Sequence, residues 1–179
     1  MNDIKNSLEA LKLALQTEEE GYKLYKSGAD HSNNKFVKSI FQQLFKDELM
    51  HMDLIKRFYA HLNKSASWTQ LDAKERNYKG LKGEIKTIFS SYLDKIQQST
   101  TAFSDYDLDI YEKAIEFEKK GILMYDKLYK ATLDDKAKKF YSFLRDMEQD
   151  HADILDNTFQ YLKNPEGWHL GQEGWTMDY

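Results

Sequence analysis

The 179-residue chain contains no cysteine. This absence excludes disulfides, zinc–thiolate sites, iron–sulfur clusters and rubredoxin-type Cys₄ iron centres from these residues. Proline is almost absent too, because the only one is Pro165. The first 164 residues can therefore form long helices without a proline break. β-branched residues are sparse, while Lys, Glu, Leu, Ala and Gln are common, which favours helix over strand.

The sequence also lacks a basic excess and a long hydrophobic run. Its formal net charge is −4, whereas a nucleic-acid-binding surface needs an excess of Lys and Arg. Nothing approaches 18 consecutive apolar residues, so we expect no membrane span. The first residues, MNDIKNSLEALKLAL, lack a basic segment followed by an uninterrupted apolar run, so we expect no signal peptide. The resulting expectation is one soluble, cytoplasmic domain over residues 1–179, with neither nucleic acid nor membrane as a partner.

The chain repeats itself at an offset of 100 residues. Aligning residues 14–62 with 114–162 gives identical residues at ten positions. Eight of these pairs occupy positions spaced three or four apart, which form one face of each helix (its seam), and the lysine and aspartate pairs do not. The pairs on the seams are Ala14 and Ala114, Glu18 and Glu118, Gly21 and Gly121, Tyr25 and Tyr125, Leu44 and Leu144, Glu48 and Glu148, His51 and His151, and Leu62 and Leu162. The shared residues are therefore mostly the ones that we expect to face inward.

Four long amphipathic patterns, with apolar residues at alternating steps of three and four, predict four helices. They cover residues 3–30, 34–62, 104–130 and 133–164. Helix-breaking residues, Ser-Asn-Asn at 32–34 and Leu-Asp-Asp at 133–135, separate the members of each pair. Connections this short predict two antiparallel helical hairpins.

Residues 63–103 join the two hairpins. They begin with a polar, irregular stretch and continue as a short amphipathic helix over residues 81–96. A connection of this length can run back along the bundle, which a four-helix bundle with one crossover requires. The predicted fold is therefore all-α, an antiparallel four-helix bundle with one long crossover. Glycines after Pro165 predict an irregular tail over residues 165–179.

The motif Glu-x-x-His occurs once in each half, as Glu48 with His51 and as Glu148 with His151. Residues three apart share a face of a helix, so each Glu and His can bind the same ion. One such motif is common by chance. Here both copies lie in register on otherwise apolar seams, where their burial without a metal is physically implausible.

Each motif is preceded, 30 residues upstream, by one more glutamate, Glu18 or Glu118. These two glutamates would bridge or cap the ions from the other two helices. Four carboxylates and two neutral imidazoles balance the charge of two divalent ions, and this donor set suits iron or manganese. The predicted metal ligands are Glu18, Glu48, His51, Glu118, Glu148 and His151.

Over nearly its whole length the chain resembles the ferritin-like superfamily, and most closely its rubrerythrin-type branch. The segments that carry the resemblance are EEEGYKLY at 18–25, DELMH at 47–51, EKKGILMY at 118–125 and EQDH at 148–151. The resemblance implies a non-haem di-iron site formed by the six residues above, and a bundle that pairs into a homodimer. Two features depart from the family. The chain has no cysteine for a rubredoxin domain, and Gly121 stands where peroxide-reducing members tend to carry an extra glutamate.

Several residues near the predicted ligands have candidate roles. Gly21 and Gly121 either allow close helix packing or open space beside the metals for O₂ or peroxide. Tyr25 and Tyr125, seven residues after Glu18 and Glu118, are either plain core aromatics or catalytic phenols that hydrogen-bond a ligand or supply an electron. Ligating histidines usually donate their other N–H to a carboxylate or carbonyl, and Asp47 and Asp150 are candidates for that contact.

The leading functional hypothesis is a di-iron oxidoreductase that reduces peroxide or O₂ with electrons from a separate donor protein. A ferroxidase that handles or stores iron is an alternative, and it would require assembly into a cage. A metal-dependent binding module and a di-iron oxygenase acting on an organic substrate are further alternatives. Manganese or a mixed iron–manganese pair could replace iron.

Overall fold

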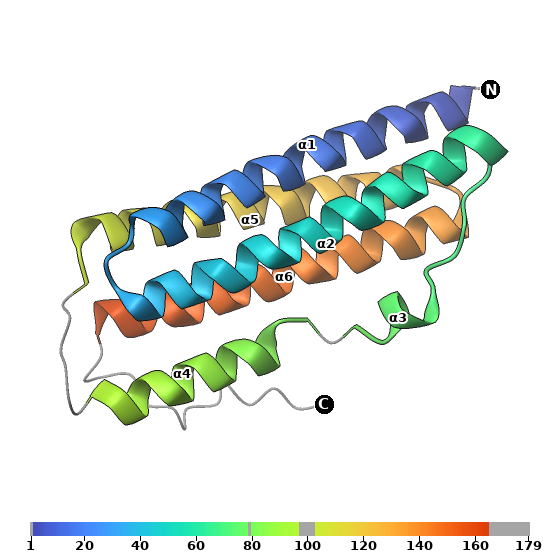
Figure 1. Ribbon diagram of the computed structural model, residues 1–179. Coiled ribbons are helices and arrows are strands. Elements are labelled where there is room, and N and C mark those ends of the chain that lie inside the picture. Colours follow the sequence, from blue (N-terminus) through green and yellow to red (C-terminus); the bar gives the residue numbers. More distant parts are fainter. Residues whose placement is uncertain (1, 79, 97–102, 165–179) are drawn as a thin grey trace.

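A computed structural model describes residues 2–78, 80–96 and 103–164, and within these ranges it contains helices and no strand (Figure 1). The four long helices are α1 (Asn2–His31), α2 (Lys35–Ser65), α5 (Asp105–Ala131) and α6 (Asp135–Lys163). The crossover contains α3 (Ala73–Arg76) and α4 (Lys82–Ile96). The predicted all-α class is confirmed. The predicted tail over residues 165–179 lies outside the described residues.

The two helical hairpins are built by matching turns. Asn34 caps α2 with its side chain, which accepts from the backbone N–H groups of Phe36 and Val37. Asp134, the repeat-related residue, caps α6 in the same way. An oxygen-bearing side chain at this position satisfies backbone donors that the first turn of a helix leaves free. Because each turn is only three residues long, α1 with α2 and α5 with α6 pack as antiparallel pairs.

The core is divided into two apolar clusters along the length of the bundle. One contains Tyr25, Phe41, Tyr111 and Leu155 among others, and the second contains Leu11, Phe58, Phe140 and Leu144. On all four long helices the predicted ligands fall between residues of the two clusters. The predicted ligands therefore form a polar layer at mid-bundle, with one apolar cluster on each side of it along the bundle axis.

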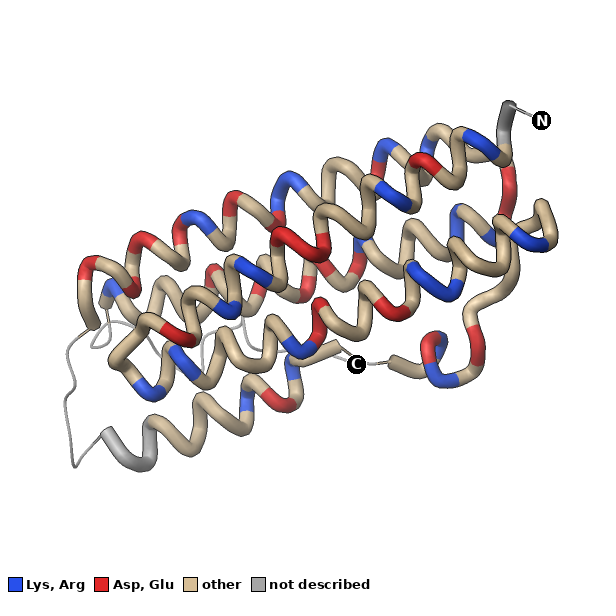
Figure 2. Tube along the Cα trace, turned by 45° about the horizontal axis from the view of Figure 1, so that its top comes forward, with Lys and Arg blue, Asp and Glu red and all other residues tan. Residues whose placement is uncertain are grey.

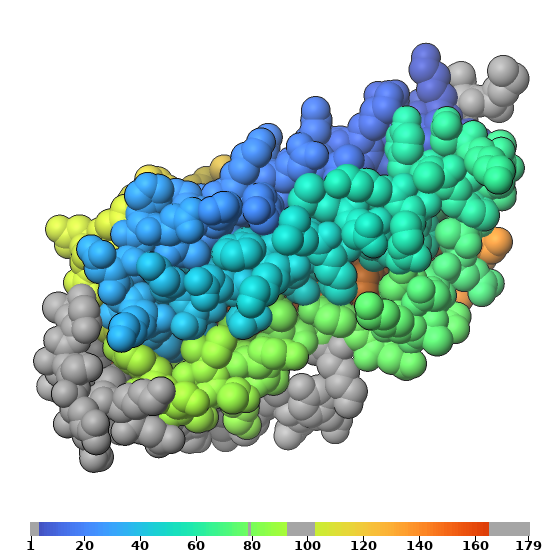
Figure 3. Space-filling model, in the orientation of Figure 1, coloured from blue at the N-terminus to red at the C-terminus, as the bar shows by residue number. Residues whose placement is uncertain are grey.

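The crossover lies along one side of the bundle, against α2 and α6 (Figures 1 and 3). Ile85 and Phe89 of α4 are buried, and the Phe89 ring packs edge-on to Tyr161 at 4.9 Å between centroids. Trp68 is also buried and contacts the ring of Phe140. The short helix α3 was not predicted, although Asp72 and Glu75 form a capping box at its start.

Basic and acidic residues are interspersed along the helices (Figure 2). Their pairs one turn apart, such as Lys113 with Asp109, lie on the outer faces. Within the described ranges, none of the helices combines the length and the apolar character that crossing a bilayer requires.

Candidate metal centre

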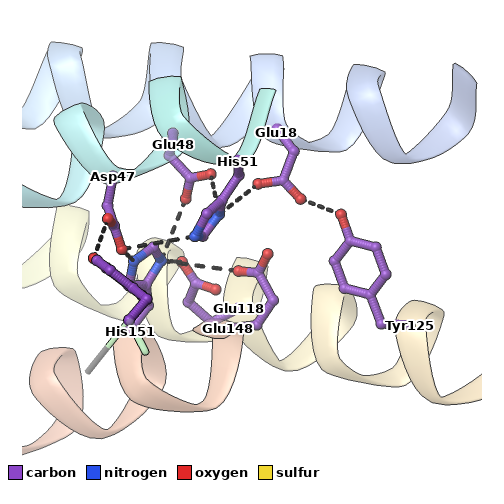
Figure 4. Close-up of polar contacts among 9 residues, drawn as sticks. Glu18, Asp47, Glu48, His51, Glu118, Tyr125, Glu148 and His151 are labelled. Carbon is purple, nitrogen blue, oxygen red and sulfur yellow. Dashed lines mark hydrogen bonds and ion pairs between the residues drawn. The ribbon is translucent and has the colours of Figure 1, made fainter. Parts of the chain in front are cut away.

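The structure brings all six predicted ligands together in the polar layer at the middle of the bundle (Figure 4). α1 and α5 each supply one glutamate, and α2 and α6 each supply a glutamate and a histidine one turn later. Every one of these residues is at most 2% exposed. The imidazole rings of His51 and His151 stack at 5.3 Å between centroids. The two halves thus contribute equal shares to a single buried cluster.

Three sets of residues could each surround an ion, and two of them, which overlap, consist of the predicted ligands alone, while the third joins Asp47 to His51 and His151. The first set comprises Glu18, Glu48, His51 and Glu148, and the second comprises Glu48, Glu118, Glu148 and His151. Within each set the ligand atoms lie within 4.8 Å of one another, which is close enough to surround one ion. Glu48 and Glu148 belong to both sets, so they are placed to bridge two ions. Of the two roles expected for Glu18 and Glu118, the geometry therefore favours capping over bridging.

Several buried polar atoms of this layer have no hydrogen-bond partner among the described residues. They are both carboxylate oxygens of Glu48 and of Glu118, Nε2 of His51 and Nδ1 of His151. His151 Nδ1 lies 3.4 Å from one oxygen of Glu48 and 3.4 Å from one of Glu118. Buried polar groups are normally paired, and unpaired carboxylates in a dry layer are costly. The donor set and its unpaired atoms fit a pair of ions such as iron or manganese.

The electrostatics of the layer also favour cations. Burial, reinforced by the charge of Glu48, raises the pKa of Glu18 to about 7. Burial and the neighbouring Glu118 raise the pKa of Glu148 well above its ordinary value. Burial alone would lower the pKa of His51, but the adjacent Glu18 and Glu48 together outweigh it and raise the pKa to about 10. Without metal, protons must therefore balance part of the buried negative charge, and cations can replace those protons.

The family model for rubrerythrin matches residues 9–159, a span that includes all six residues of the cluster. The chain belongs to the rubrerythrin family. No curated protein and no solved structure gives a match. Membership agrees with the resemblance inferred from the sequence segments. For a rubrerythrin, a buried cluster of glutamates and histidines suits a di-iron site. That these six residues bind metal stays a prediction.

Asp47 lies behind the two histidines of this rubrerythrin domain. Its Oδ2 is 2.9 Å from Nε2 of His151 and 3.6 Å from Nε2 of His51. Tyr78 of the crossover donates its hydroxyl to the other carboxylate oxygen. Burial opposes ionisation, but the hydrogen bond with His151, the charges of both histidines and the hydrogen bond from Tyr78 together hold the pKa of Asp47 below its ordinary value.

The other aspartate considered from the sequence, Asp150, lies elsewhere. Its carboxylate forms an ion pair with Lys82 at 2.7 Å, and its side chain is 23% exposed. A helix position next to a ligand therefore does not place the side chain behind that ligand. Sequence reasoning missed Tyr78, which lies in the crossover segment read as irregular, where no periodicity indicates which side chains point inward.

The two repeat-related glycines differ in the space around them. A Cβ added to Gly21 would lie 2.9 Å from Cε1 of Phe117 and 3.2 Å from Oε1 of Glu48. A Cβ at Gly121 would meet its nearest atom, Cγ of Glu148, at 3.4 Å. Only at the first position would a Cβ force a neighbouring side chain, Phe117, to shift. Both glycines border the carboxylates that belong to both ligand sets.

The two repeat-related tyrosines also differ. The hydroxyl of Tyr125 donates a hydrogen bond to Glu18, across the interface between α5 and α1. The hydroxyl of Tyr25 is buried and has no hydrogen-bond partner among the described residues. The Tyr25 ring packs edge-on to the ring of His151 at 6.3 Å between centroids. Both phenols thus border the cluster, and only one is tied to a predicted ligand.

Proposed function

We propose that this chain is a non-haem di-iron oxidoreductase that reduces peroxide or O₂. The observation that carries the proposal is the pair of overlapping ligand sets that share Glu48 and Glu148 in a buried layer. Two iron ions held there would supply the electrons that reduce the oxidant. Manganese, or one ion of each kind, fits the same donors.

Each side chain of the layer has a distinct task in this proposal. Glu48 and Glu148 would contribute to holding both ions, while Glu18 and Glu118 would each contribute to one. His51 and His151 complete the two sets. The apolar clusters on both sides exclude water, which strengthens the attraction between the carboxylates and the cations.

The proton balance of the reaction gives the two tyrosines their candidate role. Reduction of one hydrogen peroxide to two waters consumes two electrons and two protons. The hydroxyl proton of Tyr125, donated to Glu18, lies beside the cluster, and the hydroxyl of Tyr25, which has no partner among the described residues, lies on the other side of the layer. Either phenol can orient the oxidant by hydrogen bonding. These 179 residues contain no cysteine for an electron-transfer centre, and the proposal assigns the supply of electrons to a separate donor protein.

The deciding experiment is anaerobic loading of the metal-free chain with ferrous iron. Bound iron is counted, and the loaded protein is mixed with peroxide and with O₂ in a stopped-flow spectrometer. We expect two irons per chain and faster oxidation by peroxide. Fewer than two irons would contradict the di-iron assignment, and two irons that neither oxidant oxidises would indicate a metal-binding module.

Sedimentation of the loaded protein distinguishes the ferroxidase alternative from the proposal. The proposal expects a homodimer. A cage-sized assembly that continues to take up iron after two equivalents would favour the ferroxidase and iron-handling function instead.

A further inference from the structure

The residue that precedes the shared glutamate differs between the two halves of the chain. It is Asp47 before Glu48 on α2, and Met147 before Glu148 on α6. Both side chains are buried, at 5% and 4% exposure. The repeat thus places a carboxylate at this sequence position in one half and a thioether in the other.

The single carboxylate contacts the two histidines unequally. Oδ2 of Asp47 is within hydrogen-bond distance of His151 Nε2, at 2.9 Å (Figure 4). It is 3.6 Å from Nε2 of His51, which has no hydrogen-bond partner among the residues described. Both imidazoles direct Nδ1 toward the glutamates, so Nδ1 is the candidate metal-binding atom in each. Asp47 therefore orients the ring of one histidine and leaves the other without that support.

The inner nitrogens are also unequal. His51 Nδ1 is engaged by Glu18 at 2.9 Å, and this contact must be given up when Nδ1 binds an ion. His151 Nδ1 makes no hydrogen bond within the described part of the chain and lies 3.4 Å from two carboxylates. The ring of His151 is thus held from behind while its inner nitrogen is free. The ring of His51 is not held at its outer nitrogen, Nε2, and its inner nitrogen, Nδ1, is engaged by Glu18.

Tyr78 fixes the orientation of Asp47. The Tyr78 hydroxyl donates to Oδ1, which leaves Oδ2 for the histidines. Tyr78 lies on the crossover between α3 and α4, outside the four helices that supply the ligands. A carboxylate that accepts the outer N–H of a histidine fixes the ring and makes the inner nitrogen a better donor.

We propose that Asp47, held by Tyr78, is a positioning residue that makes the two metal positions unequal. The set containing His151 binds its ion more tightly and fills first. The set containing His51 fills second. The inference rests on the metal-binding part of the proposed function and adds an order of loading to it.

The test is a titration of the metal-free full chain with Co²⁺. The visible absorption of the bound ion monitors binding, and competition with a chelator gives the Kd of each step. The wild-type chain should bind two ions in two resolved steps that differ at least tenfold in Kd. Asp47→Asn keeps the size of the side chain and removes its charge. It should weaken the first step by about 10- to 100-fold, the range typical for loss of a carboxylate behind a ligating histidine, and change the second step much less. Tyr78→Phe should weaken the same step by a smaller factor.

Two other residues of α2, the helix that carries Asp47, provide matched control variants. Asp53→Asn alters an aspartate that is 80% exposed on α2, and Tyr59→Phe removes a hydroxyl from a tyrosine that lines an apolar surface groove. Neither should change either step. Because Tyr78 is partly exposed, Tyr78→Phe keeps the proposal testable if Asp47→Asn fails to fold.

A second readout identifies the histidine. In the Zn²⁺-loaded chain, the outer N–H proton of the histidine bonded to Asp47 should give a separate downfield proton resonance. Tyr78→Phe should shift this resonance and leave the outer N–H of the other ligating histidine in place.

The inference and the proposed function fail in different ways. Failure to bind two ions at all would overturn the proposed function. Two ions bound with equal Kd, or equal losses in both steps in Asp47→Asn, would overturn the inference and leave the di-metal function standing. Equal effects of Asp53→Asn and Asp47→Asn would also overturn the inference.

Discussion

The α1–α2 half and the α5–α6 half carry the same three predicted ligands at the same spacing, but the residues around those ligands differ. Gly21 is packed against Phe117 and Glu48, whereas Gly121 has ordinary contact distances around it. Tyr125 is bonded to Glu18, whereas the hydroxyl of Tyr25 is unpaired within the described residues. The repeat therefore preserves the cluster itself and lets its surroundings diverge, which is how two similar metal positions can acquire different properties.

The largest effect is expected when the two glutamates that belong to both ligand sets are removed. Glu48→Ala combined with Glu148→Ala should abolish binding of both ions, because each carboxylate belongs to both sets. An ion present at 100 times its Kd stabilises the folded state by about 2.7 kcal/mol, so two ions contribute roughly 5 kcal/mol. Thermal unfolding with and without metal should show this increment in the wild type and not in the variant.

The matched control for this variant is Asp53→Ala with Asp153→Ala. These aspartates are also 100 residues apart, and their side chains are 80% and 44% exposed. The control should keep the full metal-dependent increment. Unchanged metal content in the Glu48 and Glu148 double variant would contradict the ligand assignment.

Acidity should weaken metal binding strongly. With a pKa of about 10, His51 is protonated at neutral pH in the metal-free chain, and an imidazole must lose that proton before it can bind an ion. Binding therefore releases protons, and the affinity rises with pH. Each proton released gives about tenfold per pH unit, or roughly 1.4 kcal/mol. Calorimetric titrations at pH 6, 7 and 8, in buffers of different ionisation enthalpy, would measure the release, and an affinity independent of pH would contradict it.

The two glycines provide a paired test of local packing. Gly21→Ala should destabilise the fold by about 1–3 kcal/mol, since the new methyl group overlaps Phe117 and presses on Glu48. Gly121→Ala should be neutral or stabilising by about 0.5–1 kcal/mol, because alanine favours helix and finds ordinary contact distances. Denaturant unfolding of the metal-free proteins measures both. Equal effects would mean that the difference in packing has no energetic consequence.

The smallest difference in stability is expected between the phenylalanine variants of the two tyrosines. Tyr125→Phe removes the donor to Glu18 and should cost about 1–2 kcal/mol, in the range for a buried hydrogen bond. Tyr25→Phe removes a hydroxyl without a described partner and should change stability by less than about 0.5 kcal/mol. The same unfolding assay applies. A larger loss in Tyr25→Phe would show that its hydroxyl has a partner such as bound water.

The helices and the cluster were predictable because both depend on periodicity. Steps of three and four place Glu48 and His51 on one face, and the same steps place their apolar neighbours in the core. The sequence could not decide between bridging and capping for Glu18, because that depends on how deeply each helix enters the shared layer. It also could not separate Asp47 from Asp150, since both are adjacent to a ligand. The crossover decides that difference: Tyr78 contacts Asp47, and Lys82 contacts Asp150.

The three-residue turns at 32–34 and 132–134 have a consequence for folding. Each hairpin closes through contacts that are local in sequence, but it holds only three of the six ligands. Ions bridged by Glu48 and Glu148 would join points 100 residues apart. In a chain without cysteine, such ions would act as a reversible cross-link between its two halves. That link would stabilise the folded state, in which both halves meet at the cluster, and it would be lost on unfolding, whereas a disulfide persists and restricts the unfolded chain.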